Sequence, residues 1–216
     1  MAARSNIIEL RNLLAERFPQ PVIAQQSRIA SGVAPLDEAC GGGFPKGAIT
    51  ELTSPNLSAG TALLIARLVE AAHREHYFLA LVDGRDSFDP QPLGNARLRN
   101  LLWVRCRKTA DAVKAADLLL RDGNFPLVVL DLVLNAPEEL RKIPQTSWYR
   151  LQRLVEPVPT AFLVLTRRSM ISSAQTKLVL ENNWQIADLQ QDDNCSRLRL
   201  HVQRVQGRRQ EATGTA

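Results

Sequence analysis

The sequence contains few of the residues that most often build metal sites and disulfide frameworks. Its 216 residues include three cysteines and three histidines. Cys40, Cys106 and Cys195 lie far apart and form no C-x-x-C pair. This pattern argues against a zinc site and indicates reduced thiols, which are typical of intracellular proteins. We therefore expect no bound metal and a cytoplasmic location.

Long apolar runs are also missing. No run approaches the roughly 18 residues of a membrane span, and Glu9, Arg11 and Asn12 interrupt the segment in which a signal peptide would be expected. We expect no membrane partner. The net charge of +5, from 27 basic and 22 acidic residues, allows nucleic acid or an acidic protein surface as a partner.

Strands and helices alternate along most of the chain. A length of 216 residues with 45% hydrophobic content fits one domain. The pattern predicts an N-terminal helix at Ser5–Arg17 and a linker within residues 1–30, a core at 31–206, and a disordered tail at 207–216. In the core, the predicted strands are Ala48–Leu52, Tyr77–Val82, Leu101–Arg105, Leu127–Asp131, Ala161–Thr166, Leu178–Ala187 and Arg197–Val205. The predicted helices are Thr61–Arg74, Thr109–Arg121, Asn135–Lys142 and Thr146–Val155.

The central predicted strands are apolar on both faces, as in Phe78–Val82 and Leu127–Leu130. Helices must then cover both sides, which predicts an α/β fold with a doubly wound, mainly parallel sheet. No helix is predicted between the last two strands, and Asp192–Asn194 is turn-like. We therefore expect these two strands to form an antiparallel hairpin at the sheet edge.

The stretch from Glu51 to Thr61 has the position of a phosphate-binding loop, because it follows an apolar strand and leads into a helix. Laid over G-x-x-x-x-G-K-[ST], Ser54 and Ala59 replace the two glycines, Gly60 replaces the lysine, and Thr61 keeps the threonine. The spacing is either accidental, or it belongs to a nucleotide-binding fold that has lost its chemistry. A loop of this kind could still bind an anion weakly.

Several segments in order resemble one family. Ser31–Asp37 followed by Gly41–Gly47, then Leu81–Pro90 and Leu127–Asp131, are similar to the corresponding parts of RecA-like ATPase cores. The resemblance implies a RecA-like fold in which Asp131 stands at the Walker B position. It also places Arg85 where the family has the glutamate that activates water. A cation cannot accept a proton, and losing a general base typically costs about 10²–10⁴ in rate.

The resemblance therefore implies a protein that is not an enzyme and needs no cofactor. Ser54, Ala59, Gly60, Thr61 and Asp131 are then remnants of the nucleotide site. Without the lysine, we interpret Thr61 as a helix cap and Asp131 as a hydrogen-bond acceptor at a strand end.

The segment from Leu101 to Asp131 is similar to the middle of ImuA-type proteins, which keep the fold beside error-prone polymerases. This resemblance implies an accessory role in DNA-damage-induced (SOS) translesion synthesis, with RecA or polymerase subunits as partners; DNA contact, direct or indirect, stays open. One alternative is a SulA-like division inhibitor that binds a cytoskeletal GTPase. The other is a divergent RecA-like DNA-dependent ATPase that uses a lysine from elsewhere, such as Lys46 or Lys108.

Arginines and aromatic residues suggest the surface that such a partner would contact. Each candidate also has a plain structural interpretation: solvated arginine at strand ends, a core tryptophan, or charges that protect an edge strand. The candidates are Arg85, Arg167 and Arg168 at the carboxyl edge of the sheet, Trp148, Arg150 and Arg153 on one helix, and Arg197 and Arg199 on the terminal hairpin.

Overall fold

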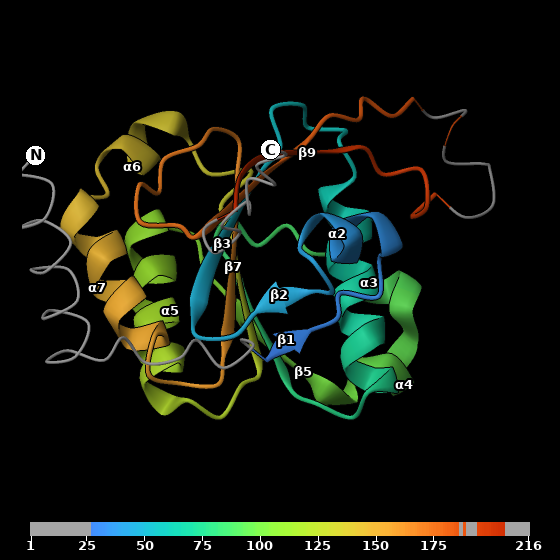
Figure 1. Cartoon of the computed structure of the whole chain (residues 1–216), viewed down its shortest axis with the longest axis horizontal. Helices are drawn as coiled ribbons and strands as arrows, with labels where there is room; N and C mark the ends of the chain where they lie inside the picture. Colours follow the sequence, from blue (N-terminus) through green and yellow to red (C-terminus); the bar gives the residue numbers. More distant parts are fainter. Residues whose placement is uncertain (1–26, 186–187, 189–193, 206–216) are drawn as a thin grey trace, which may run out of the picture.

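A seven-stranded sheet forms the centre of the computed structural model, which describes residues 27–185, 188 and 194–205 (Figure 1). The strand order is β5-β4-β6-β7-β3-β8-β9. All neighbours from β5 to β8 pair in parallel, and β9 pairs antiparallel with β8. The strands are β3 (Ala48–Thr53), β4 (Leu79–Asp83), β5 (Leu101–Arg105), β6 (Leu127–Asp131), β7 (Ala161–Thr166), β8 (Thr176–Leu180) and β9 (Leu200–Val205).

Helices cover both faces of this sheet (Figure 1). One apolar core joins α2 and α3 to the sheet, and a second core joins α5 and α7 to the opposite face. The predicted doubly wound, mainly parallel α/β fold is thus confirmed. Among the described helices, none is both long and apolar enough to cross a membrane. The helices are α2 (Ala34–Ala39), α3 (Thr61–Arg74), α4 (Gly94–Arg97), α5 (Thr109–Asp122), α6 (Pro137–Arg141) and α7 (Gln145–Val155).

Short elements that the hydrophobic pattern did not predict complete the fold. Strand β1 (Arg28–Ile29) pairs antiparallel with β2 (Phe44–Pro45) in a separate two-stranded sheet. Two 3₁₀ helices, η1 (Gln91–Leu93) and η2 (Leu98–Asn100), flank α4. Elements of two or three residues are too short to show a hydrophobic period, so only their contacts identify them.

The largest differences from the predicted boundaries occur in the last two strands. Strand β8 spans Thr176–Leu180 instead of Leu178–Ala187, because its pairing with β3 begins at Thr50 and Thr176. Strand β9 begins at Leu200 instead of Arg197. The antiparallel pairing of β8 with β9 at the sheet edge is as predicted. The predicted N-terminal helix, most of the Asp192–Asn194 turn and the predicted disordered tail lie outside the described residues.

Trp148 lies in the core, so its prediction as a surface residue was wrong. Its side chain is 0% exposed and packs in the core beneath α7 with Leu151 and Val155. The neighbouring Tyr149 is 49% exposed. Helix α7 turns Trp148 toward the sheet and Tyr149 toward solvent, since successive residues of a helix point about 100° apart.

Trp148→Ala is expected to lower the free energy of unfolding by about 3–5 kcal/mol, because it leaves a large cavity in a closed core. Tyr149→Ala, one residue away on the exposed face, should change it by less than about 1 kcal/mol. Urea unfolding followed by circular dichroism measures both. Equal effects of the two substitutions would contradict the burial of Trp148.

Candidate functional site

Parallel pairing brings the ends of four strands to one edge of the sheet. Asp83 at the end of β4 lies beside Asp131 at the end of β6, and Thr53 at the end of β3 lies beside Thr166 at the end of β7. In open α/β sheets, ligands bind at this carboxyl edge. The loop from Ser54 to Gly60 continues from β3 at the same edge, so the predicted remnants of a nucleotide site do share one region.

The hydroxyl groups of Ser54 and Thr61 bond to neighbours at this loop. The Thr61 hydroxyl donates to Ser54 Oγ (3.1 Å), and the Ser54 hydroxyl donates to the carbonyl of Asn56 (2.9 Å). Ser54, Ala59 and Thr61 are all buried. Gly60, at the start of α3, has a backbone φ of 101°, which residues other than glycine rarely adopt. Thr61 thus bonds to the preceding loop, and α3 starts without a side-chain cap, contrary to the helix cap that we expected at Thr61.

A segment that follows β8, Asn182–Trp184, lies directly against this loop. The Trp184 backbone N–H donates to the Ser58 carbonyl (2.9 Å), and its indole Nε1 donates to the Ala59 carbonyl (3.3 Å). Ser58 also donates to Asn183 Oδ1 (2.8 Å). A Cβ at Gly60 would lie only 2.9 Å from Trp184 Nε1. We call Asn182–Trp184 the covering segment.

Asp131, the predicted Walker B remnant, has the surroundings of a structural carboxylate. Its Oδ1 accepts the backbone N–H of Val133 (3.0 Å), as expected for an acceptor at a strand end. Burial raises the pKa of Asp131 to about 6; the Val133 N–H opposes the rise, and the nearby Asp83 carboxylate adds to it. The carboxylate is therefore costly to ionise in the folded protein.

Asp83 holds the loop that follows β4. This carboxylate is 1% exposed and accepts backbone N–H groups from Arg85 (3.2 Å), Ser87 (2.7 Å) and Phe88 (2.8 Å). The Ser87 hydroxyl and the Trp103 indole are two further donors (3.3 Å each). The guanidinium of Arg85 points elsewhere and donates to the Arg107 carbonyl (3.2 Å). Position 85 itself holds an arginine, which cannot act as a general base.

The predicted surface arginines separate into two groups. Arg85, Arg167 and Arg168 follow β4 and β7, so they lie at the carboxyl edge as predicted. The others are spread over different elements. Arg150 pairs with Asp117 of α5 (2.8 Å), Arg153 is exposed on α7, Arg197 stacks on the Trp184 ring (5.0 Å), and the backbone of Arg199 donates to Asn182 (2.6 Å).

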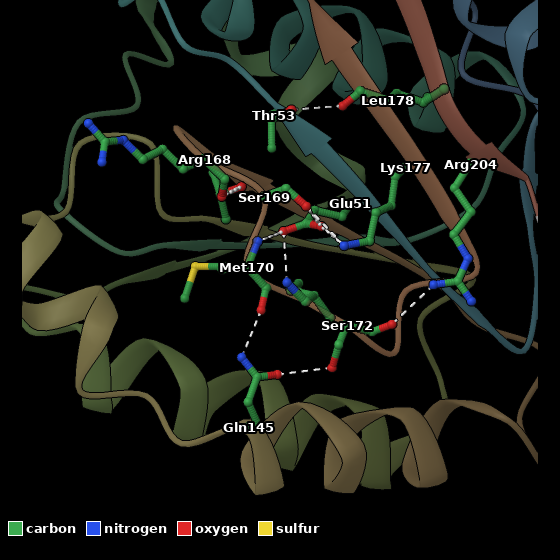
Figure 2. A network of polar contacts seen from close by, with 12 residues as sticks. Glu51, Thr53, Gln145, Arg168, Ser169, Met170, Ser172, Lys177, Leu178 and Arg204 are labelled. Atoms are coloured by element: carbon green, nitrogen blue, oxygen red, sulfur yellow. Dashed lines mark hydrogen bonds and ion pairs between the residues drawn. The ribbon is translucent and has the colours of Figure 1, made fainter.

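Glu51, which the sequence interpretation did not include, is a second buried carboxylate with several hydrogen-bond donors (Figure 2). It is 0% exposed in β3 and pairs with Lys177 of β8 (3.0 Å). It also accepts hydrogen bonds from the connection that follows β7. A single charged residue inside a fully buried strand was the available signal, because buried charges are almost always paired. Trp184 gave no comparable signal in the sequence.

Comparison with known proteins adds an independent finding. A family profile described as the RecA N-terminal domain matches residues 18–140. The chain is similar to Protein RecA of Chlorobaculum parvum, with 36% identity over 109 residues that cover 49% of this chain and 31% of that protein. Protein RecA of Picosynechococcus sp. is 33% identical over 108 residues, which cover 49% of this chain and 30% of the relative. Protein RecA of Nocardioides sp. is 32% identical over 120 residues, which cover 54% of this chain and 34% of the relative. The chain thus spans about a third of the length of these curated relatives.

Asp131→Asn is expected to raise the free energy of unfolding near neutral pH but not at about pH 4. The folded-state pKa of about 6 exceeds the ordinary value of 3.8, so the folded protein binds this proton more tightly than the unfolded chain does. Stability contributed by the protonated form is present at low pH and lost as pH rises to about 6, with a total loss of about 1–3 kcal/mol.

Urea unfolding of both proteins at about pH 4 and about pH 7.5 measures this difference. The asparagine amide oxygen can still accept the Val133 N–H, so the comparison isolates the charge. A variant that is less stable than the native protein at the higher pH would contradict the burial cost assigned to Asp131.

Proposed function

The chain belongs to the RecA N-terminal domain family, and we propose that it uses this fold to bind partners without hydrolysing ATP. Three features of the carboxyl edge support the proposal. Gly60 stands where the phosphate-binding lysine would be, the Thr61 hydroxyl is bonded to Ser54, and Arg85 stands where a general base is expected. A charge-assisted contact of the missing kind contributes about 1.5–3 kcal/mol to binding.

The observation that carries the proposal is the covering segment. Its Trp184 uses both its backbone N–H and its indole N–H to bond carbonyls of Ser58 and Ala59. Trp184 packs against the core beneath α2 and α3 together with Leu198. Phosphate groups bind the backbone N–H groups at a helix start, which requires free space over the loop. Here the protein's own chain packs against Gly60, the residue at that start.

The proposed role is that of an accessory protein in DNA-damage-induced translesion synthesis, acting in the cytoplasm through RecA or error-prone polymerase subunits. Arg167 and Arg168 support a partner surface at the carboxyl edge, since neither forms a salt bridge with any described residue. Unpaired arginines commonly contribute to binding hot spots and to steering toward acidic surfaces. The same arginines also suit DNA phosphate, as a second ligand of this surface.

The alternative of a divergent ATPase gains no support from Lys46. This lysine precedes β3, whereas the Ser54–Gly60 loop follows β3. A strand of six residues separates the two ends by about 20 Å, which exceeds the reach of a lysine side chain. No contact of the described residues favours a division inhibitor over the accessory role.

We expect the native protein to show no ATP turnover, with or without single-stranded DNA, and no heat of binding with a non-hydrolysable ATP analogue. Gly60→Lys alone should not restore binding. A side chain at this position would contact Trp184, and the backbone φ of 101° is one that residues other than glycine rarely adopt. Gly60→Lys combined with Trp184→Ala removes the closest of these contacts and leaves Leu198 Cδ2 at 3.0 Å, so it should bind more tightly than Gly60→Lys alone.

Leu57→Lys provides the matched control, since it adds the same charge to an exposed position of the same loop. A gain equal to that of the double variant would show that charge alone matters. Native turnover that disappears in Thr61→Ala or Asp131→Asn would end the non-catalytic proposal.

Arg168→Glu is expected to weaken binding to a purified translesion polymerase subunit or to RecA by about tenfold, because it reverses a charge at the proposed surface. Arg99→Glu makes the same change in η2, before β5 and thus at the opposite edge, and should change the affinity less than about twofold. Biolayer interferometry at two salt concentrations measures both. If neither protein binds the native chain, the accessory role loses its support.

A further inference from the structure

The buried carboxylate of Glu51 belongs to β3, the strand that leads to the Ser54–Gly60 loop. Its neighbours in the sheet are Val164 of β7 and Lys177 of β8. An ionised carboxylate with 0% exposure is stable only where hydrogen bonds and an opposite charge replace the lost water. The four donors around Glu51 meet that requirement.

Three of these donors come from the connection between β7 and β8. The backbone N–H groups of Met170 (2.6 Å) and Ile171 (3.0 Å) donate to Glu51 Oε1, and the Ser169 hydroxyl donates to Oε2 (2.9 Å). The fourth is Lys177, whose Nζ lies 3.0 Å from Oε2 and whose side chain is 16% exposed. Figure 2 shows Glu51 at the centre of these contacts.

The same connection is held from two other sides. Gln145 of α7 donates to the Met170 carbonyl (3.0 Å) and accepts from the Ser172 hydroxyl (3.1 Å). Arg204 of β9 donates to the Ser172 carbonyl (3.2 Å). Figure 2 places Gln145 and Arg204 on different sides of the Glu51 contacts. Among the described residues, only Glu51 accepts the backbone N–H groups of Met170 and Ile171, so it fixes the direction in which these two groups point.

We propose that Glu51 is a positioning residue, which acts with Lys177 to hold the connection Arg167–Ser172 in one conformation at the carboxyl edge. Arg167 and Arg168 begin this connection and are thereby presented in a fixed place. Their use as a binding surface rests on the proposed function, but the conformational claim does not. A connection that is ordered in advance loses less entropy when a partner binds.

The charge of Glu51 matters as much as its hydrogen bonds. Removing the charge leaves the Lys177 ammonium largely buried without its counterion, which is the costly way to break such a pair. Removing both charges avoids that cost. Substitutions at the two positions should therefore be strongly non-additive, as expected for groups in direct contact.

The test uses the full chain and needs no partner. In Glu51→Gln, amide hydrogen exchange at Met170 and Ile171, and tryptic cleavage after Arg168, should each accelerate by about tenfold, while the amides of β6 keep their rates. Glu51→Gln combined with Lys177→Met should accelerate exchange less than the product of the two single effects. Gln145→Ala is the matched control, since it frees the same connection from α7 but leaves Glu51 bonded; it should change exchange by less than about twofold.

If Glu51→Gln does not fold, Ser169→Ala replaces it in the test. This variant keeps the Glu51–Lys177 charge pair but removes one hydrogen bond to Glu51, so exchange should accelerate by about two- to threefold. Unchanged exchange at Met170 and Ile171, or an additive double variant, would overturn the proposal. Faster exchange in Glu51→Gln together with no partner binding by the native protein would leave the positioning role intact and remove the proposed function.

Discussion

Burial of parallel strands on both faces is the constraint on which the rest of this structure depends. Such strands end together at one edge, where the backbone leaves the sheet and its polar groups need new partners. Carboxylates provide many of those partners here. Asp83, Asp131 and Glu51 each accept backbone N–H groups from a neighbouring loop. Acidic side chains at this edge therefore hold the loops in place through hydrogen bonds, and any site that the loops form depends on these bonds.

Much of the fold could be predicted from the sequence because its strands and helices have strong local patterns. Three strands and one helix occur with the predicted bounds: Leu101–Arg105, Leu127–Asp131, Ala161–Thr166 and Thr61–Arg74. A continuous apolar run after a proline, as in Leu127–Leu130 after Pro126, identifies a buried strand without further information. The shift of β8 toward Thr176 has a different origin, since its start is set by pairing with β3, a partner distant in sequence.

The contacts that define the candidate site could not be predicted in this way. Trp184 meets Ser58 across more than a hundred residues, and Glu51 meets Lys177 over a similar separation. No local pattern encodes such a contact. Trp148 illustrates a second difficulty, because an aromatic residue between cations fits both a buried and an exposed helix face. Its burial followed only from the packing of α7 against the sheet.

Gly84 shows how tightly three neighbouring loops are joined. A Cβ there would lie 2.5 Å from Asn135 Oδ1 and 2.7 Å from the Asp131 carbonyl. The Asn135 amide in turn donates to the Gly84 carbonyl (3.0 Å) and to the Thr109 hydroxyl (2.8 Å). Positions 84, 109 and 135 are therefore coupled through direct contacts. Combinatorial libraries intended to give this protein new specificity should therefore hold these three positions constant and diversify the exposed loop around Leu57 instead.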